Sequence, residues 1–102
     1  MVDMERLKGR IHTRIAEFIF LPEELEDMKC SRDQAQFIAS RLAAKEAIIK
    51  AHPMPLTYHD ICLFKVGAKP RARICVDSPY SIHLSMSHEL RYALAWAIVT
   101  DE

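Results

Sequence analysis

The sequence predicts an α+β domain in which a long central helix packs on an antiparallel sheet. Helical periodicity of apolar residues dominates up to about residue 51, and alternation with a period of two dominates after it. Pro53 and Pro55 separate these two parts, because proline ends a helix. Helices followed by strands are typical of α+β domains. A chain of 102 residues has the length of one domain, so residues 1–102 are expected to form a single domain.

The first part of the chain predicts one short strand and three helical segments. Residues 1–9 alternate apolar and acidic side chains, which favours an opening strand. Residues 10–20 have the spacing of an amphipathic helix, and Pro22 with two following acids is typical of a helix start. The longest helix is expected over about residues 31–51, with Ser31 as its N-cap.

The second part of the chain predicts strands. Alternating patterns occupy residues 59–66, 71–76 and 82–88, and residues 91–100 form an aromatic and β-branched run suited to a buried strand. The first two strands are separated by a predicted turn at residues 67–70.

Composition excludes several classes of protein. The sequence has 14 basic and 14 acidic residues, so general electrostatic capture of nucleic acid or of an anionic membrane is not indicated. Its longest apolar run, Tyr92–Val99, is far shorter than a membrane span of about 20 residues. Cys30, Cys62 and Cys75 are odd in number and widely spaced, which predicts neither a disulfide framework nor a zinc site. With no targeting segment recognised, a cytoplasmic protein is expected.

The long helix carries charged residues in an unusual place. At 100° per residue Lys45 falls within the apolar stripe formed by Leu42 and Ile49, while Glu46 lies at the edge of that stripe and Lys50 follows one turn later. Small neighbours leave space for a ligand to approach Glu46. The structural alternative is a snorkelling Lys45 beside a surface pair of Glu46 and Lys50.

Two further segments carry polar groups. Small hydroxyls and an imidazole in Ser85–Glu89, at the end of a predicted strand, suit phosphate oxygens, although a polar edge and turn explains them equally well. Asp3 is a carboxylate in a short apolar segment. Paired with Glu46 across the fold, it would supply the hard oxygen ligands that Mg²⁺ prefers.

Several motifs occur in an order and spacing that resemble one known family. Arg41–Ala47 followed by Lys50 resembles the RFAAKEAxxKA helix of the acyl-carrier-protein synthases, and Ser85–His88 followed by Tyr92–Ala95 is similar to their SxSH strand end and YAxA strand. Weaker matches lie at Val2–Met4, His59–Ile61 and Gly67–Pro70. The resemblance extends over nearly the whole chain and implies a 4'-phosphopantetheinyl transferase-like fold.

The resemblance implies a transferase that loads carrier proteins, including those of fatty acid biosynthesis, from coenzyme A. Asp3 and Glu46 would bind Mg²⁺, and with Lys50 they would form the catalytic group. Coenzyme A would contact four residues: Lys45, Lys50, Ser87 and His88. A carrier serine would attack the β-phosphate of coenzyme A, and 3',5'-ADP would leave.

The resemblance also implies the partners. Arg10 and Arg14 match positions near the carrier-docking surface of the family, where an acidic helix of an apo acyl carrier protein would meet a basic patch. The family typically forms homotrimers with sites between neighbouring subunits, which would add buried area to a small core.

Two departures from the family pattern keep other interpretations open. Met1 stands where the family has its opening glycine, and His52–Pro55 replaces the glycine-rich loop after the long helix. A degenerate member that binds carrier protein or coenzyme A without catalysis is therefore an alternative. An unrelated small α+β binding domain with chance motif matches is another.

Overall fold

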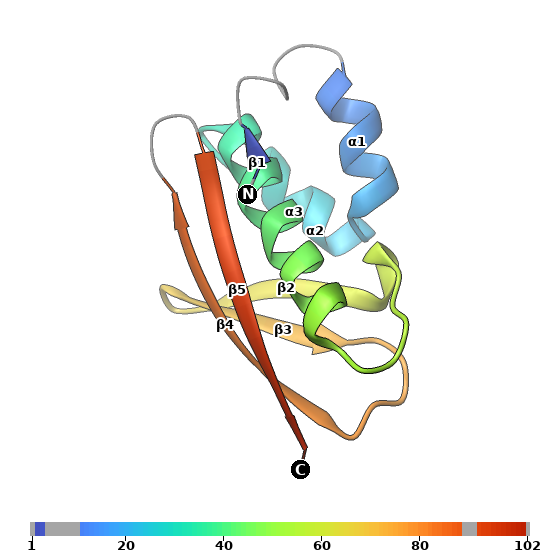
Figure 1. The fold of residues 1–102 in the computed structure, drawn as a ribbon. Coiled ribbons are helices and arrows are strands. Elements are labelled where there is room, and N and C mark those ends of the chain that lie inside the picture. The colour runs from blue at the N-terminus through green and yellow to red at the C-terminus, as the bar shows by residue number, and fades with distance from the viewer. Residues whose placement is uncertain (1, 4–10, 89–91, 102) are drawn as a thin grey trace.

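The long helix α3 (Gln34–Ala51) lies at the centre of the fold. The computed structural model describes residues 2–3, 11–88 and 92–101, and in it α3 lies between two shorter helices and the two long C-terminal strands (Figure 1). The shorter helices are α1 (Ile11–Ile19) and α2 (Pro22–Lys29), and both contact α3. This arrangement confirms the predicted α+β class with a central helix.

The described strands form two antiparallel sheets. The first has the order β1-β5-β4, with β1 at Val2–Asp3, β5 at Tyr92–Asp101 and β4 at Tyr80–His88. The second is the hairpin of β2 (Ile61–Val66) and β3 (Lys69–Ile74). In Figure 1 this hairpin crosses β4 and β5 at a steep angle, so β3 and β4 do not share a ladder. The sequence predicted the antiparallel pairing but not the division into two sheets.

The start of α3 differs from the prediction. Asp33, not Ser31, is the N-cap: its carboxylate accepts a hydrogen bond from the backbone N–H of Gln36 at 3.0 Å. The Ser31 hydroxyl instead donates to the carbonyl of Asp33 at 3.2 Å. A charged carboxylate is the better acceptor for the free N–H groups at a helix start, which explains why the helix begins two residues later than Ser31 suggests.

The prediction for the second strand pair also needs adjustment at its ends. His59 and Asp60 belong to a 3-10 turn, η2 (Tyr58–Asp60), so the strand begins at Ile61. The Asp60 carboxylate closes this turn by accepting from the N–H of Thr57 at 2.8 Å. The hairpin turns at Gly67, whose φ is 64°, a conformation that glycine adopts readily. The turn is therefore shorter than the predicted residues 67–70, and β3 begins at Lys69 and not at residue 71.

Among the described residues, the buried side chains form two clusters, and α3 contributes to both of them. The first cluster joins α1, α2 and α3 through seven buried residues: Ala16, Ile19, Phe20, Met28, Ala35, Ile38 and Ala39. The second cluster is built from Ala44, Ile48, Leu56, Ile61 and Leu63. Because α3 contributes to both clusters, its alanines allow close packing where larger residues would not fit.

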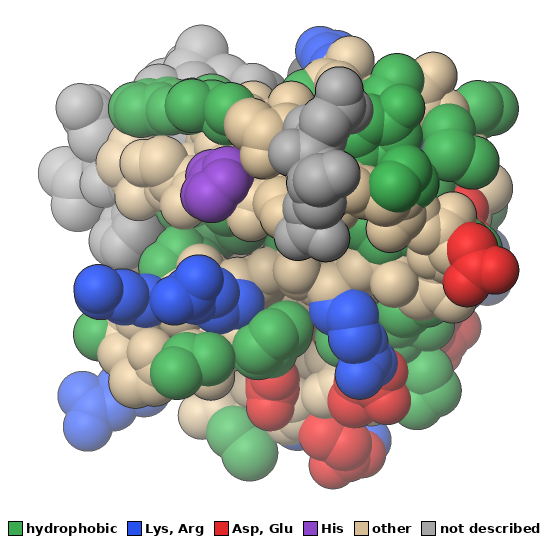
Figure 2. Space-filling model, turned by 90° about the horizontal axis from the view of Figure 1, so that it is seen from below, with side chains coloured by type: hydrophobic (Ala, Val, Ile, Leu, Met, Phe, Trp, Pro, Cys, Tyr) green, Lys and Arg blue, Asp and Glu red, His purple; other side chains and the backbone are tan. Residues whose placement is uncertain are grey.

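The neutral total charge is unevenly distributed on the surface. Figure 2 shows several Lys and Arg side chains gathered on the left of the displayed face, and acidic side chains on its right and lower parts, where other Lys or Arg side chains lie among them. The β2–β3 hairpin carries four cations, Lys65, Lys69, Arg71 and Arg73, and no acidic residue. Local electropositive surface is therefore available for an anionic ligand despite the balanced composition.

The three cysteines are free thiols. Burial, together with the neighbouring charges of Glu24 and Glu23, raises the pKa of Cys62 to about 11, so this thiol is protonated at neutral pH. None of the helices in the described ranges combines the length and apolar character required to span a bilayer.

Candidate anion and carboxylate site

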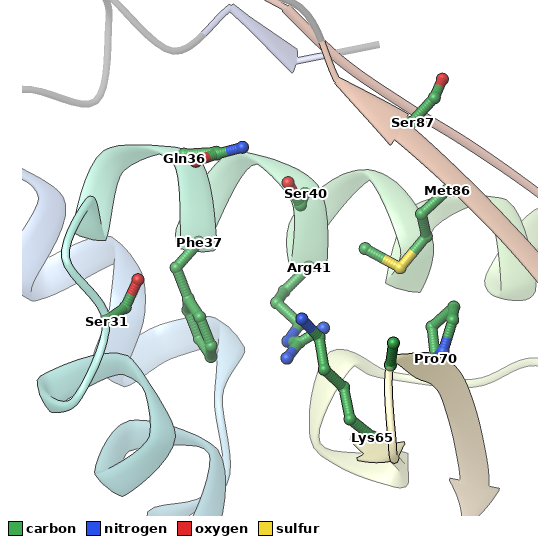
Figure 3. A pocket seen from close by; sticks show the side chains of 10 residues that line it. Ser31, Gln36, Phe37, Ser40, Arg41, Lys65, Pro70, Met86 and Ser87 are labelled. Atoms are coloured by element: carbon green, nitrogen blue, oxygen red, sulfur yellow. The ribbon is translucent and has the colours of Figure 1, made fainter.

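A cavity of about 430 Å³ lies where α3, the β2–β3 hairpin and the end of β4 meet (Figure 3). Its lining mixes hydroxyl and amide groups, cations and apolar side chains: Ser31, Gln36, Phe37, Ser40, Arg41, Lys65, Ala68, Pro70, Met86 and Ser87. Figure 3 shows Arg41 and Lys65 extending into this space from α3 and β2. Two cations beside apolar surfaces form a site suited to an anion that also carries a flat or apolar group.

Arg41 is the most informative residue of this cavity. It is only 6% exposed, and its guanidinium lies 4.6 Å from the centre of the Phe37 ring. Its Nε is buried without a hydrogen-bond partner among the described residues. Burial lowers the pKa of Arg41, an effect partly opposed by Asp27 and Glu24. A buried donor without an acceptor is unfavourable, so an anionic ligand at this place would satisfy Arg41.

A second cavity of about 330 Å³ lies between α3 and β5, and it contains the two predicted catalytic residues of the helix. Glu46 and Lys50 are one turn apart on the same face of α3 and line this cavity together. Most of the remaining lining is alanine, at positions 43, 47, 51, 95 and 97, and Trp96 completes it. The expected open space beside Glu46 is therefore confirmed.

The backbone brings the other predicted site segments toward β5. Asp3 pairs with Tyr92 on one edge of β5, and His88 pairs with Ala93 on the other edge. The short strand β1 also contacts α3, the helix that carries Glu46. Joint metal binding by Asp3 and Glu46, and contact of His88 with coenzyme A, stay predictions.

Ser87 lies where the sequence places it, at the end of β4. Its side chain is exposed and lines the same cavity as Arg41 and Lys65. The strand end, the β2–β3 hairpin and α3 thus converge on one anion-suited space.

The prediction that Lys45 contacts coenzyme A is wrong. Lys45 is fully buried, and its ammonium group donates to Glu24 at 2.6 Å and to the backbone carbonyls of Ile19 and Tyr58, each at 2.9 Å. An ammonium has three N–H donors, so none remains for a phosphate. Burial lowers the pKa of Lys45, and the hydrogen bond to Glu24 opposes this shift. The sequence pattern identified Lys45 as unusual, but the partner of its charge is Glu24 of the same chain and not a ligand.

Glu24 was missed because the sequence suggested a solvated acid in the first turn of a helix. It is 1% exposed, and its two oxygens accept from Lys45, from the N–H of Leu21 and from the N–H of Leu63. Arg41 and Lys65 were also missed as site residues. Arg41 lies in the quoted helix motif, but Lys65 reaches the cavity only through the fold of the hairpin.

Arg14, one of the two predicted docking residues, is exposed on α1. Phe18 lies one turn further on and is 71% exposed, so a cation and a large apolar side chain share this surface. Arg10 lies outside the described residues.

Fold and cavities together define a small α+β protein with an anion-suited cavity and a separate carboxylate–lysine cavity on one helix. A sequence model of the 4'-phosphopantetheinyl transferase superfamily matches residues 2–98. The holo-[acyl-carrier-protein] synthase of Clostridium kluyveri is 30% identical over 97% of this chain and 84% of its own length. The corresponding protein of Halalkalibacterium halodurans is 32% identical over 97% of this chain and 89% of its own.

Solved structures agree with this relationship. The holo-(acyl-carrier-protein) synthase of Bacillus anthracis in complex with CoA (3',5'-ADP) has a TM-score of 0.87 at 24% identity, covering 99% of this chain and 91% of its own. The acyl carrier protein synthase of Mycobacterium tuberculosis has a TM-score of 0.74 at 27% identity, with coverage of 99% and 92%. The chain therefore belongs to the 4'-phosphopantetheinyl transferase superfamily, a family of transferase enzymes, as its motifs indicated.

Proposed function

We propose that this chain transfers the 4'-phosphopantetheine group of coenzyme A to a serine of an apo acyl carrier protein, with Mg²⁺, releasing 3',5'-ADP. The observation that carries the proposal is the placement of Glu46 and Lys50 together on an open cavity of α3. A carboxylate and an ammonium one turn apart suit a hydrated cation and the phosphate that it neutralises.

The cavity around Arg41 is the proposed site for the phosphorylated nucleotide end of coenzyme A. Arg41 and Lys65 would bind its phosphates, and Phe37, Met86 and Pro70 would contact its apolar surfaces. The buried Nε of Arg41 supports this assignment because it requires an acceptor. Ser87 would donate its hydroxyl, and His88 would lie at the same strand end.

The chemistry follows from these positions. Asp3 and Glu46 would hold Mg²⁺, which when bound polarises the phosphoryl oxygens and neutralises their charge. Lys50 would orient the diphosphate by a charge-assisted hydrogen bond. The carrier serine attacks the β-phosphorus of coenzyme A, and a carboxylate of the site accepts the serine proton. The bond between the β-phosphorus and the bridging oxygen of the diphosphate breaks, and 3',5'-ADP leaves with that oxygen.

We also propose a homotrimer with composite sites. The ladder from β4 to β5 presents two large exposed apolar residues, Trp96 at 55% and Ile98 at 57% exposure, opposite Ser85 and His83. An apolar face of this kind supports contact with other copies of the chain. The Arg41 cavity includes residues of β4, and the Glu46 cavity includes residues of β5. A cyclic assembly through this face would therefore bring the Arg41 cavity of one copy beside the Glu46 cavity of the next copy.

The test is mass spectrometry of an apo acyl carrier protein incubated with this protein, coenzyme A and Mg²⁺. We expect the carrier to gain about 340 Da, the mass of one phosphopantetheine group, and EDTA to prevent the gain. Sedimentation of the same sample reports the oligomer. A carrier that binds but gains no mass, across several carriers, would support the binding-only alternative, which the short loop His52–Pro55 favours.

Arg14→Glu is expected to raise the KM for the carrier about tenfold, equivalent to about 1.4 kcal/mol. The physical reason is that an acidic carrier would meet a repelling charge on α1. Steady-state rates at several salt concentrations check this, and the salt dependence of KM should weaken in the variant. Arg32→Glu makes the same charge change at an exposed residue that is not part of α1. Equal effects of both variants would argue against docking at Arg14.

A further inference from the structure

A cavity of about 380 Å³ lies in the seam where β3 crosses β4 (Figure 1), and it shares no lining residue with either cavity of the proposed transferase site. Arg71 lines it from β3, and His83 lines it from β4. Ser78, from the segment that joins the two strands, adds a hydroxyl. The seam is therefore a separate concave surface with basic and hydroxyl side chains.

The backbone along this seam is open as well. β3 pairs only with β2, and β4 pairs only with β5, so each strand has one edge without a ladder partner among the described residues. β3 and β4 contact each other, but no backbone hydrogen bond joins them in the described part of the chain. N–H groups on these edges are available to the acceptor atoms of a ligand.

Ser78 presents a hydroxyl donor to the cavity. The N–H of Met54 donates to Nδ1 of His52 at 3.1 Å and has no other acceptor among the described residues. Nδ1 also lies 3.1 Å from the Met54 carbonyl, but a proton on Nδ1 would leave that N–H without an acceptor, so the neutral ring carries its proton on Nε2. Nε2 then donates to the Ser78 oxygen at 2.9 Å, and the N–H of Tyr80 donates to the same oxygen at 3.3 Å. Because both acceptor positions of this oxygen are used, its own O–H points to an acceptor that the described residues do not supply.

His52 holds this donor in place. Its ring is only 6% exposed and meets the ring of Tyr80 edge to face, with centroids 5.2 Å apart and an interplanar angle of 78°. His52 is also the first residue of the segment that replaces the glycine-rich loop of the family. The replacing segment therefore supports one wall of the seam.

The positive charge of the cavity is not neutralised by the protein. Arg71 is exposed and forms no ion pair among the described residues, whereas Arg73, two residues further along β3, pairs with Glu23 at 3.6 Å. No aspartate or glutamate of the described residues lines the cavity. The seam thus combines a cation with several hydrogen-bond donors, which is the chemistry of an anion site.

We propose that this seam binds the phosphate group of a small molecule, at a site separate from the one proposed for coenzyme A. The Arg71 guanidinium can donate two parallel hydrogen bonds to phosphate oxygens, and Ser78 and His83 donate to the others. A phosphate accepts hydrogen bonds in several directions and a carboxylate in one plane, so donors from both strands and from the joining segment favour phosphate. Half-buried Ile74 and Ile82 line the same cavity and provide apolar contact for an organic group on the phosphate.

The test is a titration of the isotope-labelled protein with inorganic phosphate, followed by NMR of the backbone amides at constant ionic strength. We expect saturable shifts at the amides of Arg71, Tyr80 and His83, and no saturable shift with chloride. Phenyl phosphate distinguishes the source of the phosphate: tighter binding than inorganic phosphate identifies an organic ester, and equal binding identifies free phosphate. Shifts confined to the residues of the Arg41 cavity would overturn the inference. Because the titration requires neither coenzyme A nor turnover, its result stands even if the protein transfers no phosphopantetheine.

Matched variants locate the site. Arg71→Gln is expected to weaken phosphate binding about tenfold, because a charge-assisted hydrogen-bonded pair is lost. Arg73→Gln removes the same charge from the same strand but from a residue that does not line the cavity, so it should change the dissociation constant less than about twofold. Ser78→Ala should also weaken binding, and Ser78→Thr, which keeps a hydroxyl, should restore it.

Two results would contradict the proposal. Equal weakening by Arg71→Gln and Arg73→Gln would mean general attraction to a basic surface. Unchanged phosphate binding in Arg71→Gln would mean that the phosphate lies elsewhere. Thermal unfolding and sedimentation of each variant, compared with the wild type, show that a loss of binding does not come from a changed fold or oligomer.

Discussion

Glu46→Gln is expected to lower the rate of phosphopantetheine transfer at least 100-fold while the protein stays folded. The amide has nearly the same size as the carboxylate but carries no negative charge, so it cannot provide the anionic oxygen that Mg²⁺ requires. The side chain is half-buried on an open cavity, so the substitution should change the free energy of unfolding by no more than about 1 kcal/mol. Initial rates with saturating coenzyme A and carrier, followed by mass spectrometry, measure the loss.

Two comparisons make this experiment decisive. Glu26→Gln makes the same chemical change at an exposed acid on α2 and should leave the rate unaltered. A Mg²⁺ titration should show that Glu46→Gln requires more metal for any residual activity. Full activity of purified Glu46→Gln would refute the assignment of Glu46 as a metal ligand, whatever the fold implies.

The sequence predicts a helix or strand correctly where the residues of that element alone contain the pattern that defines it. The long helix has a continuous periodic pattern and stops at Pro53, so its existence and C-terminal end could be predicted. The choice between Ser31 and Asp33 as N-cap depended on which side chain reaches a free N–H, which is a matter of local geometry. The division of the strands into two sheets depends on the angle at which β3 and β4 cross, and the sequence of either strand alone does not indicate this angle.

The same distinction applies to the candidate site. The positions of Glu46, Lys50 and Ser87 on the two cavities could be predicted because these residues lie in contiguous motifs at fixed helical or strand positions. Lys65 could not, because it is an ordinary exposed lysine until the hairpin brings it to the cavity of Arg41. Glu24 lies 21 residues before Lys45, and only the packing of α2 on α3 shows that the two charges neutralise each other.

Lys45→Met is expected to lower the free energy of unfolding by about 3–5 kcal/mol, the typical effect of breaking a buried ion pair from one side. Glu24 would remain 1% exposed with its charge uncompensated, and the carbonyls of Ile19 and Tyr58 would each lose a donor. A domain of this kind has a total stability of about 5–15 kcal/mol, so the variant would lose a large part of it. Urea denaturation followed by circular dichroism measures the change.

The origin of this loss can be separated from simple loss of packing. Adding Glu24→Gln to Lys45→Met removes the stranded charge but keeps a side-chain carbonyl that can accept from Leu21 or Leu63, so the double variant should be more stable than Lys45→Met alone. Lys29→Met breaks an exposed pair with Glu26 and should change stability by less than about 0.5 kcal/mol. If Lys45→Met lowered the free energy of unfolding as little as Lys29→Met, the buried Lys45–Glu24 pair would not be the interaction that holds α1, α2 and η2 against α3. In that case the positions of Glu46 and Tyr58 would have to depend on the surrounding apolar packing alone.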